Sequence, residues 1–89
     1  MSEREALIEA MIALVLTRSA MKREQHTSGE MHVHGVLLGD DQLEGIGLTA
    51  SDATDDLRQR LRGKFARALA ALEDGGVDVM DLMRRQVQP

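Results

Sequence analysis

Apolar side chains dominate the N-terminal part of the chain, from Ala6 to Leu16, where Glu9 is the only polar residue. Ser2 and Glu5 precede this run in a capping-box pattern, which predicts a helix over residues 2–21. The large apolar positions of this helix are Leu7, Ile8, Met11, Ile12, Leu14, Val15 and Leu16. At about 100° per residue they cover nearly half of its circumference, so the helix must be covered on more than one side.

The same apolar run is too short to cross a membrane. A spanning helix needs roughly 20 apolar residues, and Arg18, Lys22 and Arg23 close this run. A secretory signal carries basic residues before its apolar part, whereas Glu3 and Glu5 stand there in this chain. We therefore expect a buried helix and no membrane association.

A β-hairpin is predicted over residues 30–49. The polar run 22–30 contains a Ser-Gly pair and favours the end of the first helix. Residues 31–48 then have the pattern of two strands around the turn-forming residues 39–42.

The two faces of this hairpin are both partly apolar. Because successive side chains of a strand alternate, Met31, Val33 and Leu37 are expected on one face. The opposite face carries His32, His34, Val36 and Leu38. Because a two-stranded hairpin alone is marginal in water, we expect it to pack on the helices, with extension of the sheet across a dimer axis as a further possibility.

A second long helix is predicted over residues 51–74. Its apolar positions recur at intervals of three and four, and Thr49, Ser51 and Asp52 are competing N-caps. The apolar positions are Leu57, Leu61, Phe65, Ala68, Leu69 and Leu72. A Gly-Gly pair ends this helix, and Asp78 caps a short helix over residues 78–87.

The expected fold is therefore α+β, a single small domain over residues 1–89 with a helix, a β-hairpin, a long helix and a short C-terminal helix. Over residues 2–74 this element order resembles that of small phage head–tail joining proteins of the lambda W type. It resembles small antitoxin and inhibitor modules more loosely. The resemblance implies a phage or mobile-element origin; it carries no shared motif and assigns no role to a residue.

Composition excludes several kinds of site. The chain has no Cys, Trp or Tyr and one Phe, which excludes disulfides, thiolate metal sites, a Cys nucleophile and most stacking platforms. The lack of disulfides suits a cytoplasmic location. A core of Leu, Ile, Val, Met and Ala in so short a chain supplies only about 3–5 kcal/mol, so we expect association with a second subunit or a partner.

The histidines are the candidate metal ligands. On a strand, His32 and His34 point the same way with Cβ atoms roughly 7 Å apart, so both can reach one ion. His26 or Glu30 could supply a third ligand, as could a symmetry mate. We favour histidines at the surface or in a dimer interface, and metal binding or a pH-responsive interface are the alternatives.

The segment Gly45 to Ala50 formally matches a dinucleotide-binding fingerprint. That motif needs a parallel βαβ unit and an acidic residue about 20 positions later, and Phe65 occupies that place. We predict instead that Gly35, Gly45 and Gly47 let a helix lie close to the hairpin.

Basic residues recur on the second long helix, at Arg58, Arg60, Arg62, Lys64 and Arg67. Arg60, Lys64 and Arg67 line one edge of the apolar stripe and are the candidate contacts to nucleic acid. Acidic residues bracket the helix, and 15 Asp and Glu against 11 Lys and Arg give a net charge of -4. We therefore favour salt bridges over nucleic-acid binding.

Two helical faces are candidate interfaces with a partner or a second subunit. Gly63, Ala66 and Ala70 form a small-residue stripe that allows close helix packing, unless it is an alanine face chosen for helix propensity. The interface positions are Ala10, Met11 and Leu14 on the first helix and Gly63, Ala66 and Ala70 on the second.

Catalysis is not expected. No Ser stands in a nucleophile elbow, and the chain is short for enclosing both a core and a pocket of roughly several hundred Å³. We expect a non-enzymatic module without a cofactor that binds a larger protein and forms a homodimer, such as an inhibitor, an antitoxin-like regulator or an assembly connector. The alternatives are a small metal-binding module and a nucleic-acid-binding regulator.

Overall fold

The computed structural model describes residues 2–26 and 29–87, with side chains except at 20 and 23–26. The elements follow in the order α1 (Glu3–Thr17), β1 (Ala20–His26), β2 (Gly29–Leu38), β3 (Asp41–Gly47), α2 (Ala50–Asp74) and α3 (Val79–Val87). They form an α+β fold in which three helices accompany a three-stranded antiparallel sheet.

The first helix begins where the sequence predicted and ends earlier. Ser2 is its N-cap, and the Ser2 Oγ accepts a hydrogen bond from the Glu5 N–H at 3.1 Å. The prediction that the helix continues to residue 21 is wrong, because it ends at Thr17 and β1 begins at Ala20. β1 is largely polar, and its pairing with β2 satisfies the backbone without an apolar pattern. The extra strand also changes the element order on which the phage-protein resemblance rested.

The predicted hairpin is present as two strands of the larger sheet, whose order is β1-β2-β3. β2 is central: Ala20 pairs with Gly35 on one side, and Leu43 pairs with Val36 on the other. The turn is tighter than expected and consists of Gly39 and Asp40, with Gly39 at a φ of 63°. The alternation of faces is confirmed, since His34 and Val36 face the helices.

α2 packs against β3 and β2 on one face of the sheet, and Thr49 is the N-cap that the structure selects. Two glycines on β3 set this close approach. A Cβ built on Gly45 would lie 2.2 Å from the Ala53 carbonyl oxygen, and one on Gly47 would lie 2.6 Å from the Ala53 nitrogen. The prediction is thus confirmed for Gly45 and Gly47 and wrong for Gly35, where the nearest atom is Glu44 Cγ at 3.7 Å.

The core lies between the three helices and the inner face of β2. Its buried members are Ile8, Ile12, Val36, Leu57, Leu61, Leu69, Val79 and Met83. α3 covers the N-terminal half of α1, and Arg84 binds Glu3 there at 2.6 Å. Asp78 caps α3 as predicted, because its Oδ1 accepts from the Asp81 N–H at 3.2 Å.

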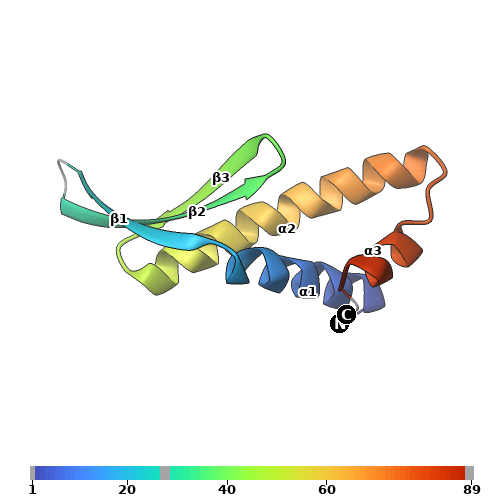
Figure 1. Cartoon of the computed structure of the whole chain (residues 1–89), viewed down its shortest axis with the longest axis horizontal. Coiled ribbons are helices and arrows are strands. Elements are labelled where there is room, and N and C mark those ends of the chain that lie inside the picture. Colours follow the sequence, from blue (N-terminus) through green and yellow to red (C-terminus); the bar gives the residue numbers. More distant parts are fainter. Residues whose placement is uncertain (1, 27–28, 88–89) are drawn as a thin grey trace.

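The molecule is elongated, with extents of 48 × 24 × 24 Å. Figure 1 shows the sheet at one end, α2 running along the long axis, and α3 beside α1 at the other end. Within the described residues, no helix combines the length and the apolar composition that a membrane span requires.

Candidate functional site

A groove with a volume of about 660 Å³ lies between α1 and the sheet. We call it the α1–β2 groove. Its apolar lining consists of Met11, Leu14, Val15, Val33, Gly35, Val36, Leu37, Leu38 and Phe65. Its polar lining consists of Arg18, Ser19, Lys22, Gln42, Glu44 and Gln86.

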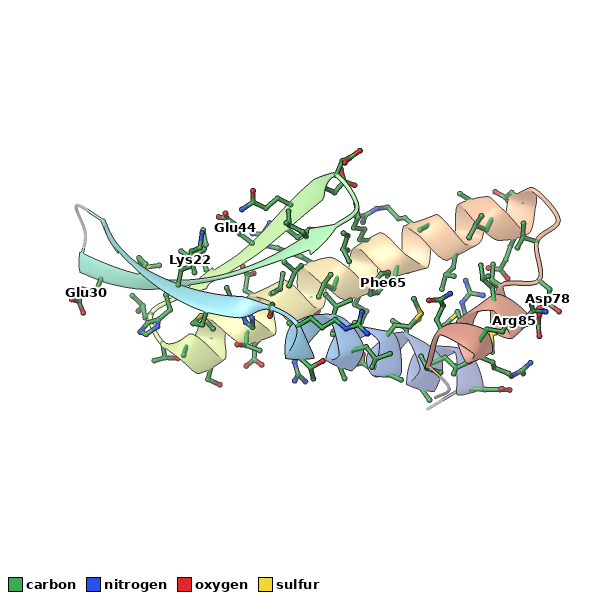
Figure 2. The ribbon with its side chains drawn as sticks, viewed as in Figure 1. Lys22, Glu30, Glu44, Phe65, Asp78 and Arg85 are labelled. Carbon is green, nitrogen blue, oxygen red and sulfur yellow. The ribbon has the colours of Figure 1, made fainter. Side chains whose placement is uncertain are left out.

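The groove exists because β1 is shorter than β2. The first residue of β1, Ala20, pairs with Gly35 of β2, and the chain before Ala20 comes from α1 and lies outside the sheet. This leaves a space beside Val36–Leu38. Figure 2 shows Phe65 on α2 between α1 and the tip of the β2–β3 hairpin, with Lys22 and Glu44 on the sheet. The expectation from chain length concerned a pocket that the chain encloses, and this groove is open, so it does not test that expectation.

The groove has a cationic rim formed by Arg18 and Lys22. Within the described residues, neither side chain forms an ion pair, although other basic residues do. Both are exposed at the mouth of the groove, at the end of α1 and on β1. On the sheet side, Glu44 also lines the groove and accepts a hydrogen bond from Gln42 Nε2 at 2.9 Å. Arg18 and Lys22 were expected only to close the apolar run of the first helix, because their common position at the groove depends on where α1 ends.

The basic residues of α2 are largely occupied by acidic partners. Arg60 Nε lies 3.1 Å from Asp56 Oδ2, and Lys64 Nζ lies 2.7 Å from Asp41 Oδ2. Hydrogen bonds from the Ile46 N–H and then from Arg60 lower the pKa of Asp56. Arg67 has no ion pair among the described residues, and its Nη1 lies 3.2 Å from the Cβ position of Gly63.

These contacts favour salt bridges as the role of the basic residues on α2. Arg62 also forms one, since its Nε lies 2.7 Å from Glu9 Oε1 on α1. The partners Glu9 and Asp41 were not foreseen, because each is distant from α2 in sequence. Of the three candidate contacts to nucleic acid, Arg67 alone has no acidic partner among the described residues.

His34 joins three elements through its ring nitrogens. Nε2 forms a hydrogen bond with Ser19 Oγ after α1, and Nδ1 lies 3.1 Å from Thr54 Oγ1 on α2. The two hydroxyls also reach backbone carbonyls, Ser19 that of Leu16 and Thr54 that of Ala50. In a neutral imidazole one ring nitrogen donates and the other accepts, so one hydroxyl donates to the ring and the other to its carbonyl.

The hydrogen-bonded series Ser19, His34 and Thr54 superficially resembles a catalytic triad, in which a serine nucleophile, a base and an orienting group follow one another. A serine nucleophile needs a base that accepts a proton, and a carboxylate commonly stabilises the resulting imidazolium. Here a neutral threonine stands at that place, and burial lowers the pKa of His34, which opposes the charged form. The chemistry of this cluster therefore favours a structural role.

The His-x-His metal hypothesis receives no support from this arrangement. Both ring nitrogens of His34 are already hydrogen-bonded, so ligation would break one of these bonds. His32 lies on the same face of β2, while the side chain of His26 lies outside the described residues. No group of three His, Cys, Asp or Glu side chains in the described part of the chain could hold a metal ion.

Acidification is expected to destabilise the protein through His34. Burial lowers its pKa in the folded state, so the unfolded chain binds the proton more readily. The stabilisation from neutral His34 is present above the unfolded pKa of about 6.5 and is lost as the pH falls through the folded pKa. Urea melts from pH 8 to pH 5 should show this loss in wild type. His34→Gln should be less stable at pH 8 and should have a flatter profile, and an equally steep profile in that variant would contradict the assignment.

The predicted interface residues do not form one surface. Met11 and Leu14 line the α1–β2 groove, where Leu14 is 40% exposed. Ala66 and Ala70 are exposed on α2 outside that groove, and Gly63 is half-buried beneath Arg67. Ala10 is half-buried on α1 and does not line the groove.

Sequence reasoning identified two groove residues, Met11 and Leu14, and missed the free end of β2. The feature of the sequence that would have indicated this edge is the early end of α1. That end was hard to locate, because a run of polar residues follows it. Gly45 and Gly47 lie in β3 against α2, so the formal nucleotide fingerprint is a packing feature. No protein-family model matches the chain, and no curated protein or solved structure matches it either.

Proposed function

We propose that this protein is a non-enzymatic interaction module that acts by binding a larger protein through the α1–β2 groove. The observation that carries the proposal is the α1–β2 groove itself, which is open and largely apolar and lies beside two cations that form no ion pair with any described residue. Its volume lies within the range of about 300–1,000 Å³ that is typical of ligand pockets. An inhibitor, an antitoxin-like regulator or an assembly connector of phage or mobile-element origin would act by such binding.

The side chains in the groove support binding over catalysis. Leu37 is 72% exposed at its border, and large apolar residues exposed beside a groove commonly mark interaction sites. The polar lining consists of cations, amides, one carboxylate and Ser19, whose hydroxyl is held by His34 and Leu16. These groups recognise charge and shape, and they offer no activated nucleophile.

Self-association is a second part of this proposal and uses a different surface. Ala66 and Ala70 are exposed on α2, where small side chains permit a close approach of a second helix. We expect a homodimer through this stripe. Light scattering at micromolar concentration should give twice the mass of one chain, and Ala66→Glu should return it to the monomeric mass.

A matched pair of leucine variants tests the role of the groove. Leu37 and Leu48 are 72% and 73% exposed, but only Leu37 lines the groove. With tagged protein as bait in extracts of its native host, wild type and Leu48→Glu should retain the same protein. Leu37→Glu should bind it at least about 30-fold more weakly, which corresponds to a loss of about 2 kcal/mol of binding free energy. Equal retention by both variants would contradict binding through the groove.

A further inference from the structure

We propose that the α1–β2 groove takes an extended segment of the partner protein, which adds as a strand beside Val36–Leu38 and places a carboxylate between Arg18 and Lys22. The inference rests on the proposed function and specifies the chemistry of the partner. Three features of the groove support it: a free strand edge, an apolar floor and a cationic rim.

The strand edge is free because the sheet is staggered. Val36, Leu37 and Leu38 pair with β3 through Leu43, Gln42 and Asp41. On the other side of β2, pairing with β1 ends at Gly35. Successive residues of a strand direct their backbone groups to opposite sides, so some N–H and C=O groups of Val36–Leu38 face the groove. An extended peptide can pair with such an edge by strand addition.

The floor beside this edge selects apolar side chains. Phe65 from α2 lines it together with Met11 and Val15 from α1. In a strand, alternate side chains point to the same face, so every second side chain of the added segment would point toward this floor. The groove therefore favours a segment in which apolar residues alternate with polar ones.

The rim determines the charge of the segment. The β1–β2 register pairs Ala20 with Gly35, so the chain before Ala20 leaves the sheet at the point where the free edge begins. Arg18 and Lys22 flank that point, and both are exposed and without an ion pair among the described residues. Carboxylates of the segment would be attracted to this end of the groove, whereas Glu44 repels them on the β3 side.

The same charges disfavour a second copy of this chain at the edge. Antiparallel pairing of the edge with itself would place a two-fold axis near Leu37 and bring the Arg18 side chains of both copies close to it. Like charges that meet in an interface oppose association. The acidic, extended segment of another protein therefore fits the site better than self-pairing does.

Synthetic peptides of opposite charge test this proposal directly. The probe is a short peptide in which leucines alternate with glutamates, and its counterpart carries lysines in place of the glutamates. We expect the acidic peptide to bind at least about tenfold more tightly, by fluorescence anisotropy. In NMR spectra it should shift the amide signals of Val36, Leu37 and Leu38. A proline in its centre, which removes an N–H donor, should weaken binding.

Charge reversal on the protein provides the control. Arg18→Glu/Lys22→Glu should bind the acidic peptide at least about tenfold more weakly and prefer the lysine peptide. Arg58→Glu/Arg67→Glu has the same net charge and changes cations that lie outside the groove, so it should bind as wild type does. Equal binding of both peptides, or no amide shifts at Val36–Leu38, would overturn the proposal. Slow hydrogen exchange of the Leu37 amide, which faces the free edge, in a peptide-free dimer would also overturn it and assign the edge to a second copy.

The native partner separates this inference from the function on which it rests. One outcome is that Leu37→Glu loses binding of the native partner while Arg18→Glu/Lys22→Glu binds it unchanged. That result would keep the groove as the binding site and overturn the proposal that an acidic segment occupies it. A partner that binds both variants as well as wild type would overturn both proposals. We expect both variants to weaken its binding.

Discussion

Replacing Gly45 by alanine is expected to destabilise the protein by about 3 kcal/mol or more, the upper end of overpacking effects. The new Cβ would lie 2.2 Å from the Ala53 carbonyl oxygen and 2.5 Å from the Leu57 nitrogen. Both atoms belong to the backbone of α2, so no side chain can rotate away. The helix would have to move off β3, and the packing of Leu57, which is fully buried, would loosen with it.

Thermal unfolding followed by circular dichroism measures this effect. For a domain of this size, about 3 kcal/mol corresponds to a fall in Tm of roughly 12–24 °C. Gly35→Ala is the matched control, because its Cβ would have only ordinary contacts, at 3.7 Å to Glu44 Cγ and 3.8 Å to the Leu43 oxygen. A Gly45→Ala variant as stable as Gly35→Ala would show that α2 does not lie against β3 at this point.

Truncating Leu61 to alanine is expected to lower the free energy of unfolding by about 2–5 kcal/mol. Leu61 has no exposed surface and stands in the core cluster with Ile12 and Met83. The loss combines the transfer of buried methyl groups with the cavity that remains, because close-packed neighbours relax only in part. The free energy of unfolding of a typical domain is about 5–15 kcal/mol, so this one change removes a large part of the stability.

The same helix supplies the control for this prediction. Leu72→Ala deletes the same atoms from a side chain that is 38% exposed, and we expect a loss of about 1 kcal/mol or less. Urea denaturation gives both free energies of unfolding. If Leu61→Ala were no more destabilising than Leu72→Ala, the core would not be centred on α2 as the structure places it.

The three helices could be predicted from local sequence, and so could their ends, except the C-terminal end of α1. Ser2 and Asp78 act as the N-caps that were expected, and Gly75-Gly76 ends α2. The apolar spacing of α2 also identified Leu57, Leu61 and Leu69 as buried. These features depend on neighbours within one or two helical turns, so the residues that make them are close together in the sequence.

The candidate site was only partly predictable. Met11 and Leu14 were expected at an interface because α1 is apolar on more sides than one helix contact covers. Arg18, Lys22 and the edge at Val36–Leu38 were not expected, since they depend on the length of β1 relative to β2. The ion pairs of Arg62 with Glu9 and of Lys64 with Asp41 also depend on which elements become neighbours.

The sequence by itself determined the helices, the hairpin turn and the two faces of β2, because periodicity, caps and turn chemistry are local. Only the tertiary structure decided that residues 20–26 form a strand, that His34 bonds to Ser19 and Thr54, and that a groove with a cationic rim lies beside β2. The physical reason is that strand pairing satisfies backbone groups between distant segments. A polar stretch such as β1 carries no local sign of the partner strand that orders it.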